Sequence, residues 1–561
     1  MLHVWKKLEG IHKLLLLIPG VEILSGSGLL LRYTRRIVIP EDVSSDLSRL
    51  SIYALLVRSL QIFESEYQAY SIDSWANLAA YLPFLGRSFL PNLQCLIVNS
   101  SASLIVGMSW VGIFLSPSLV EIELPTNSEN SQAWIPESEA SALLASVAVR
   151  CPSLRAITIL PRSDEERGGS GPRRSMATFS YEYITSMTSL QALTIGKYMI
   201  QPKSLKNIGL LPALQTLAIH DPPEKVALAV FDARLPEHLF PSLRHLQLHR
   251  INACEIALLW RIDTLVKRLT HVDIKTVSPE KEYVYEPGRK GLESWLPELF
   301  RNSPSIHHLS IGCHPSFPGG LQTLPTSSLL TIFNLPLESF SFTLNRTLDL
   351  DNFCRQLAKS CPGLWRLHIP YVSVTLSLLA EITGHFKYLE HSGADVSWTS
   401  ELPQKGESGW LYSSGFLTCL EYSPARLYHS SSEISTLDMA IYFLTVWPNL
   451  RHVRPTEGWS RSDTIPGKVS EIVSSVHEAV LCACATCARR TESLEYESAW
   501  SLFKKVSPET AHSYSYQFGS GFDLGPEIDF TQLTNEFLPG DLGPMFDIGS
   551  LNDWPGDEPL Q

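Results

Sequence analysis

One short pattern recurs fourteen times along this chain and limits the folds open to it. The pattern is an apolar residue, two variable residues, an apolar residue, one variable residue and a last apolar residue, and the final copy is shortened. Copies begin 22 to 37 residues apart, about 30 on average. Because repeated units stack and share one core, this pattern predicts a single solenoid rather than the three or four globules suggested by 561 residues. The copies begin at Val57, Leu93, Leu119, Leu154, Leu190, Leu214, Leu243, Leu269, Ile306, Leu337, Leu364, Phe386, Leu417 and Leu450.

Each copy is preceded by signals for the end of a helix. A proline often stands two residues before the first apolar residue, as Pro152 does before Leu154. Proline lacks a backbone donor and favours extended geometry in the residue before it, so it ends a helix and permits a strand. Upstream, Leu143, Leu144 and Val147 have helical spacing. We therefore predict a unit of helix, breaker, short strand and turn, with strands of successive units paired in parallel.

The period and the strand pattern resemble leucine-rich repeats over about 400 of the 561 residues. Val4–Leu8 and the run from Leu14 to Gly20 resemble the stretch that follows the F-box in fungal F-box/leucine-rich-repeat proteins, and Cys151–Leu154 is similar to repeats of that group. In that family, the box binds the adaptor of a cullin-RING (SCF-type) ubiquitin ligase and the repeats hold the substrate. No Leu-Pro-x-Glu-Leu/Ile motif precedes Trp5, so we expect adaptor binding only with an F-box upstream of Met1.

The predicted fold class is α/β: a leucine-rich-repeat horseshoe with parallel strands on its concave face and helices on its convex face. We expect a helical post-F-box-like cap over 1–40, an irregular leucine-rich-repeat solenoid over 41–460 and a C-terminal helical cap over 461–513. An acidic, disordered tail is predicted over 514–561, with nine acidic residues and no Lys or Arg. Acidic and apolar residues alternate there, which is typical of activation segments or partner-binding motifs. A solvated tail without a dedicated partner is the alternative.

Composition narrows the function classes. The chain is 44% hydrophobic and 18% charged, so it has enough apolar residues for a large core. A net charge of −12 disfavours nucleic-acid binding, although the nine acids of the tail account for most of it. Ten scattered cysteines are typical of a reducing compartment. No apolar run approaches the 18 or so residues that span a bilayer. We expect a monomer in cytoplasm and/or nucleus, without membrane or nucleic-acid partners.

Two columns of side chains are expected on the concave face. Strand alternation turns the apolar positions inward, so the residue before the second apolar position and the residue after it face outward. Strands lie about 4.8 Å apart, which predicts a ladder of His245, His271 and His308 with Asp273 beside it. Such a ladder suits an acidic or phosphorylated protein partner, with partial protonation near neutral pH; an ordinary polar surface is the alternative. The candidate partner-binding residues are His245, Gln247, His271, Asp273, His308, Arg366, His368, His452 and Arg454.

Catalytic and metal motifs are not found in the sequence. It lacks a phosphate-binding loop, a dinucleotide fingerprint, His-Glu-x-x-His and Gly-x-Ser-x-Gly. Cys482, Cys484 and Cys487, near His477, have a spacing that could begin a zinc site, but a buried helical stripe also explains two of these thiols. We therefore expect no catalytic residue, cofactor or metal. The sequence favours a non-enzymatic protein-recognition module, a ligase substrate receptor by resemblance, with a scaffold that lacks ligase docking as the alternative.

Overall fold

A computed structural model describes most of the repeat region. The chain divides into two compact units, Met1–Glu478 and Ala479–Gln561, and every described residue belongs to the first. Cys482, Cys484, Cys487 and the predicted acidic tail therefore lie outside the described residues. The described ranges are 4–25, 34–40, 47–64, 69–72, 88–98, 104–124, 134–162, 182–221, 235–276, 295–313, 331–342, 350–396, 416–422, 436–455 and 469–475.

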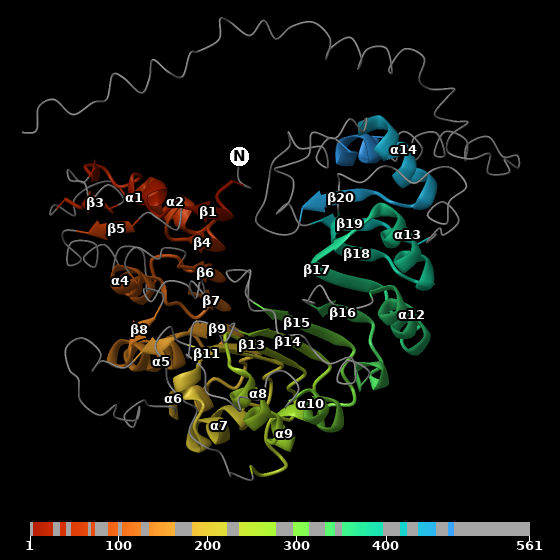
Figure 1. The fold of residues 1–561 in the computed structure, drawn as a ribbon. Helices are drawn as coiled ribbons and strands as arrows, with labels where there is room; N and C mark the ends of the chain where they lie inside the picture. The colour runs from red at the N-terminus through yellow and green to blue at the C-terminus, as the bar shows by residue number, and fades with distance from the viewer. Residues whose placement is uncertain are drawn as a thin grey trace, which may run out of the picture. The chain divides into compact units, whose positions relative to one another are not determined.

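The first unit is built on one parallel sheet of 15 strands (Figure 1). The strand order follows the chain, so the strand of each repeat pairs with those of the repeats before and after it. The strands are β1 (Lys7–Glu9), β4 (Ser59–Gln61), β6 (Cys95–Ile97), β7 (Glu121–Glu123), β9 (Ala156–Ile159), β11 (Ala192–Gly196), β12 (Thr216–His220), β13 (His245–His249), β14 (His271–Thr276), β15 (His308–Cys313), β16 (Ser339–Phe342), β17 (Arg366–Val374), β18 (His391–Val396), β19 (Cys419–Tyr422) and β20 (His452–Pro455).

The helices lie together on one side of this sheet (Figure 1). In α5 the buried residues are Ala140, Leu143, Leu144 and Val147, which is the helical stripe predicted from the sequence. The helical elements are α1 (His12–Leu15), α2 (Ser48–Ala54), α4 (Leu104–Phe114), α5 (Glu137–Arg150), α6 (Glu182–Ser186), η4 (Lys197–Met199), α7 (Pro202–Gly209), α8 (Ala253–Trp260), α9 (Asp263–Val266), α10 (Leu296–Asn302), η7 (Thr331–Asn334), α12 (Leu350–Ser360), α13 (Leu376–His385) and α14 (Thr436–Val446).

The repeated apolar positions form one continuous core in register. Leu246 pairs with Val272, which pairs with Leu309, and all three are buried. The proline before many strands occupies the second position of a turn that leaves the helix. In the repeat at Leu154, the Leu154 N–H donates to the Cys151 carbonyl across Pro152, and proline's fixed φ suits that position. The chain is therefore an α/β leucine-rich-repeat solenoid, as the sequence predicts.

The repeat begins inside the segment for which we expect a helical cap. Within residues 1–40, α1 spans only four residues, and β1 joins the main sheet through Leu8, which pairs with Leu60. β2 (Glu22–Ser25) and β3 (Thr34–Val38) form a second sheet with β5 (Ala69–Ile72). The sequence pattern does not reveal β1, because this strand has one apolar residue, Leu8, between charged neighbours and is followed by Gly10. A two-stranded sheet joins β8 (Ile135–Pro136) and β10 (Pro161–Arg162).

One late copy lies three residues further along than the sequence pattern indicates. The copy placed at Phe386 begins at Leu389, because His391 of β18 pairs with Arg366 of β17. Phe386 is instead the buried C-cap of α13. Ser392 and Ala394 occupy the apolar positions of this repeat and are both buried. Small residues replace leucine there, which is why the pattern points to the wrong residue.

Residues 469–475, the described part of the predicted C-terminal cap, are helical; the boundaries of that cap and of the solenoid stay predictions.

Within the described residues, no helix has the length and apolarity needed to cross a membrane. Six cysteines whose side chains the structure describes are free thiols: Cys95, Cys151, Cys254, Cys354, Cys361 and Cys419.

Candidate functional site

The side of the main sheet opposite the helices, here called the strand face, carries all nine candidate residues. In β13 burial alternates, with Leu246 and Leu248 in the core and His245, Gln247 and His249 half-buried on the strand face. The same alternation turns Phe340 and Phe342 of β16 inward and Ser339 and Ser341 outward. The strand face is therefore a polar surface laid directly over an apolar core, as the alternation predicts.

The predicted histidine ladder is present on β13, β14 and β15. His245 pairs with His271 and His271 with His308. The rings of His271 and His308 stack with centroids 4.0 Å apart, and those of His245 and His271 lie 5.6 Å apart at a tilt of 49°. Gln247 Nε2 lies 3.1 Å from His245 Nε2. Asp273 pairs with Gln247 in the next row of side chains, so five of the nine candidates form one group.

Burial holds the ladder in its neutral form. It lowers the pKa of His271 to about 4, with the charges of His308 and His245 acting in the same direction. Burial also lowers the pKa of His245 and of His308, against the opposing effects of Asp273 and Glu338 respectively. This differs from the expected partial protonation near neutral pH, because burial and the neighbouring imidazoles both disfavour the charged forms. At neutral pH the ladder offers uncharged nitrogens that donate or accept hydrogen bonds.

A second histidine pair extends the ladder at the ends of the strands. His220 of β12 and His249 of β13 stack with centroids 4.3 Å apart, and His249 pairs with Lys275 of β14. Burial lowers the pKa of His220 to about 3, and the charges of His249 and Lys275 act in the same direction. These residues follow the last apolar position of their repeats, a third column that the sequence reasoning did not consider.

The later candidates gather around one carboxylate. Glu421 of β19 accepts a hydrogen bond from Arg454 Nη2 of β20 at 2.7 Å and lies 3.8 Å from Arg366 Nη2 of β17. Its side chain is 12% exposed, whereas those of Arg366 and Arg454 are 44% and 58% exposed. Burial favours the neutral acid, but the hydrogen bond from Arg454 and the charge of Arg366 outweigh it and lower the pKa of Glu421. We call these three side chains the arginine cluster.

His368 of β17 lies over β18, one of the two strands between those that carry the arginines. Its partner in register is Gly393 of β18, and a Cβ at Gly393 would overlap the His368 ring. Burial lowers the pKa of His368, so the ring is uncharged near neutral pH. His452, the remaining candidate, is exposed and pairs with Cys419. Glu421 and Gly393 were missed because the repeats at Phe386 and Leu417 match the pattern weakly and were left out of the columns.

A buried ion cluster joins three successive repeats near the ladder. Lys197 of η4 is 3% exposed and lies 2.8 Å from Glu255 of α8 and 2.9 Å from Asp221, which follows β12. We call these side chains the lysine cluster. Its burial and its position between repeats indicate a role in holding them together. The three residues lie outside the repeated pattern, so the sequence gives no sign of their contact.

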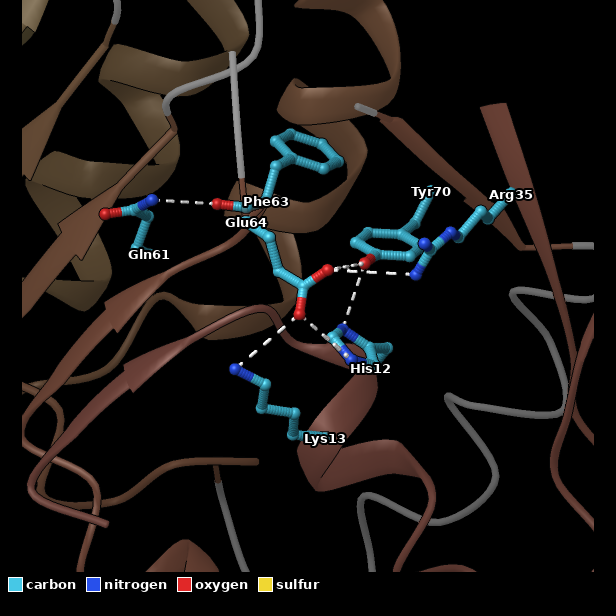
Figure 2. Close-up of polar contacts among 7 residues, drawn as sticks. All are labelled: His12, Lys13, Arg35, Gln61, Phe63, Glu64 and Tyr70. Atoms are coloured by element: carbon cyan, nitrogen blue, oxygen red, sulfur yellow. Dashed lines mark hydrogen bonds and ion pairs between the residues drawn. The ribbon is translucent and has the colours of Figure 1, made fainter. Parts of the chain in front are cut away.

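Another polar cluster surrounds Glu64 near the start of the sheet (Figure 2). Its carboxylate lies 3.4 Å from His12 Nε2, 3.6 Å from Lys13 Nζ and 3.7 Å from Arg35 Nη1. The Tyr70 hydroxyl lies 3.3 Å from Glu64 Oε2 and 3.0 Å from His12 Nδ1. Burial, with the charge of Glu64, raises the pKa of Tyr70 to about 12. The cluster links the first repeats to the small sheet through β3 and β5, which indicates a structural role.

The strand face changes character along the chain. On β7 it carries Glu121 and Glu123, and burial together with Glu121 raises the pKa of Glu123. From β13 onward histidines and arginines dominate, as the sequence columns predict. Within the described residues, no group of three or more His, Cys, Asp or Glu side chains is placed to hold a metal ion. The strand face therefore offers hydrogen bonds, ion pairs and stacking to a ligand.

Comparisons with known proteins add likeness of fold. No protein-family model and no curated protein sequence matches the chain. The leucine-rich-repeat-containing protein LegL7 of Legionella pneumophila is 10% identical with a TM-score of 0.30, covering 64% of this chain and 90% of that one. An internalin, InlF, of Listeria monocytogenes is 11% identical with a TM-score of 0.25, covering 65% and 82%. A chain of the mouse RP105/MD-1 complex is 13% identical with a TM-score of 0.32, and the match covers 72% of this chain and 59% of that one. The fold assignment rests on the repeat and on the register of the sheet.

Proposed function

We propose that this chain is a non-enzymatic protein-recognition module and that the strand face from β13 to β20 binds the partner. One observation carries the proposal: eight adjacent strands present polar side chains in register, serines on β16 and at least one histidine, arginine or carboxylate on each of the others. A broad polar surface fixed on a rigid sheet is preorganised, which reduces the ordering that binding requires. Arginine is one of the residues that contribute most strongly at protein interfaces.

A finer proposal concerns the pathway. By resemblance to fungal F-box/leucine-rich-repeat proteins, the bound protein would be the substrate of a cullin-RING ubiquitin ligase, with an F-box supplied upstream of Met1. The alternative is a scaffold without ligase docking, favoured by the acidic and aromatic residues of 514–561, which suit a second partner.

Matched serine substitutions test the strand face. Ser310 and Ser341 are neighbours in register on β15 and β16, so a Ser310→Arg, Ser341→Arg double variant places two long side chains in the middle of the surface. The control is Ser146→Arg, Ser360→Arg on α5 and α12, where both serines are exposed. Affinity purification from cells of the source organism should recover the same proteins with wild type and control and lose them with the strand-face variant. Equal recovery from all three proteins contradicts the proposal.

The same purification distinguishes a ligase receptor from a scaffold. A cullin and its adaptor should co-purify with the chain, extended by any in-frame F-box upstream of Met1, if it is a ligase receptor. Partners without ligase subunits favour the scaffold. A deletion of 514–561 that removes part of the partner list supports a role for that segment, and an unchanged list opposes it.

A further inference from the structure

The arginine cluster has more cations than anions, and both of its guanidinium side chains are partly exposed. Glu421 is nearly buried, and it holds Arg454 by a 2.7 Å hydrogen bond and Arg366 by a longer 3.8 Å ion pair. About half of each guanidinium side chain remains in contact with solvent. A guanidinium has five N–H donors in a fixed fork, so one carboxylate leaves donors on both arginines for a ligand.

The strands between the two arginines leave room for this arrangement. Arg366 and Arg454 lie on β17 and β20, with β18 and β19 between them. At the level of Glu421, β18 contributes Gly393, and the His368 ring covers it. The ring is flat and uncharged near neutral pH, because burial lowers the pKa of His368. The His368 ring therefore lies over one of the two strands that separate the strands of Arg366 and Arg454.

Charge indicates which anion fits. The two guanidiniums and Glu421 sum to +1, which a single carboxylate neutralises. A phosphate monoester carries a charge of about −1.5 to −2 at pH 7 and would bring excess negative charge close to Glu421. Arginine binds planar carboxylates through paired N–H donors, and these charge-assisted bonds are about twice as strong as neutral ones.

We propose that Arg366 and Arg454 bind a carboxylate side chain of an acidic segment in the partner protein, with Glu421 as the positioning residue that orients both guanidiniums. This inference rests on the proposed function, because it names the chemistry that the strand face recognises. It places the strongest polar contact at the β17–β20 end of the face, whereas the uncharged ladder contributes hydrogen bonds and stacking.

Fluorescence anisotropy with short peptides tests the assignment on the full chain. The probe is a labelled decamer of glutamate, compared with a decamer of glutamine and with a glutamine decamer that carries one phosphoserine, at about 150 mM salt. We expect the glutamate peptide to bind and the glutamine peptide not to bind. Arg366→Gln and Arg454→Gln should each weaken binding about tenfold or more, the usual loss for a charge-assisted bond.

The control variant removes two cations from the helix side, Arg301→Gln in α10 and Lys359→Gln in α12. Both side chains are exposed, so the control should bind the glutamate peptide as the wild type does. If the control loses as much affinity for the glutamate peptide, the peptide binds through general charge attraction, and the proposed site is wrong. Circular dichroism melts confirm folding, and Arg366→Lys, which keeps the charge without the fork, should lose affinity in a folded protein.

The positioning role of Glu421 has its own readout. Glu421→Gln removes the negative charge that opposes a dianion, so the affinity ratio of the phosphoserine peptide to the glutamate peptide should rise several-fold. A residue with a merely structural role would lower both affinities and leave the ratio unchanged. Tighter binding of the phosphoserine peptide by the wild type overturns the carboxylate assignment. A separate outcome is that peptide affinity is unchanged in Arg366→Gln and Arg454→Gln while the Ser310→Arg, Ser341→Arg variant still loses the cellular partners. In that case this inference fails and the proposed function stands.

Discussion

The lysine cluster and the arginine cluster have opposite charge arrangements. In the first, Lys197 lies between the carboxylates of Asp221 and Glu255 and is 3% exposed. In the second, the Glu421 carboxylate lies between two guanidiniums that are about half exposed. The buried cluster joins three repeats. The exposed cluster turns its unsatisfied donors to solvent. Exposure, rather than the presence of an ion network, therefore separates a structural cluster from a candidate binding site.

The largest expected effect comes from breaking the buried cluster. Lys197→Ala removes the cation that Asp221 and Glu255 share in a largely buried cluster, which costs about 3–5 kcal/mol of unfolding free energy. Urea denaturation measures the loss, and Lys359→Ala on α12, whose side chain is exposed, should change it by less than about 0.5 kcal/mol. If Lys197→Ala costs no more than its control, the lysine cluster does not hold the repeats together.

The next effect concerns the glycine beneath His368. Gly393→Ala adds a Cβ where the ring lies, so we expect overpacking to cost about 1–3 kcal/mol and to displace His368 from the arginine cluster. Gly363→Ala is the matched control, because nothing lies within 4 Å of a Cβ there. Thermal melts of the two variants should differ clearly. Equal melting temperatures would show that the ring does not depend on Gly393.

Glu421→Gln should destabilise the protein less than Lys197→Ala, by about 1 kcal/mol, because its partners are half exposed and water screens the pairs. The pKa of Glu421 is lowered in the folded state. Its contribution is therefore complete above the ordinary value of 4.5 and is lost as the pH falls below it. The difference in unfolding free energy between wild type and Glu421→Gln should shrink as the pH falls from 6 to 3.5. If this difference in unfolding free energy stays constant with pH, the ion pairs of Glu421 do not stabilise the fold.

The smallest effect is expected at the ladder. The folded-state pKa of His271 is about 4, below its ordinary value of 6.5. The unfolded chain therefore binds more protons between these values, so stability is complete above pH 6.5 and falls as the pH drops toward 4. Because His271 is only partly buried and water screens its charge, we expect about 1 kcal/mol or less. His271→Gln should reduce the pH dependence of the unfolding free energy over this window. The same slope in wild type and variant would contradict the lowered pKa of His271.

The sequence predicts the regular parts of this molecule and misses the irregular ones, for a physical reason. A ladder of His245, His271 and His308 follows from strand spacing alone, because every repeat obeys the same alternation. The weak copy at β18 is misplaced because small residues fill its core positions. Lys197 meets Glu255 across 58 residues, a contact set by how the units stack rather than by local pattern. Glu421 was missed because the copy that begins at Leu417 was treated as a weak match, and the lysine cluster because its contacts depend on stacking.

Site-specific photo-crosslinking tests most directly whether the strand face binds the partner. A benzophenone amino acid replaces Ser341 on β16 in one protein and Ser360 on α12 in another, and each is irradiated in cells of the source organism. We predict a protein adduct from position 341 and none from position 360. Adducts that form only from position 360 would place the partner on the helices and contradict the account.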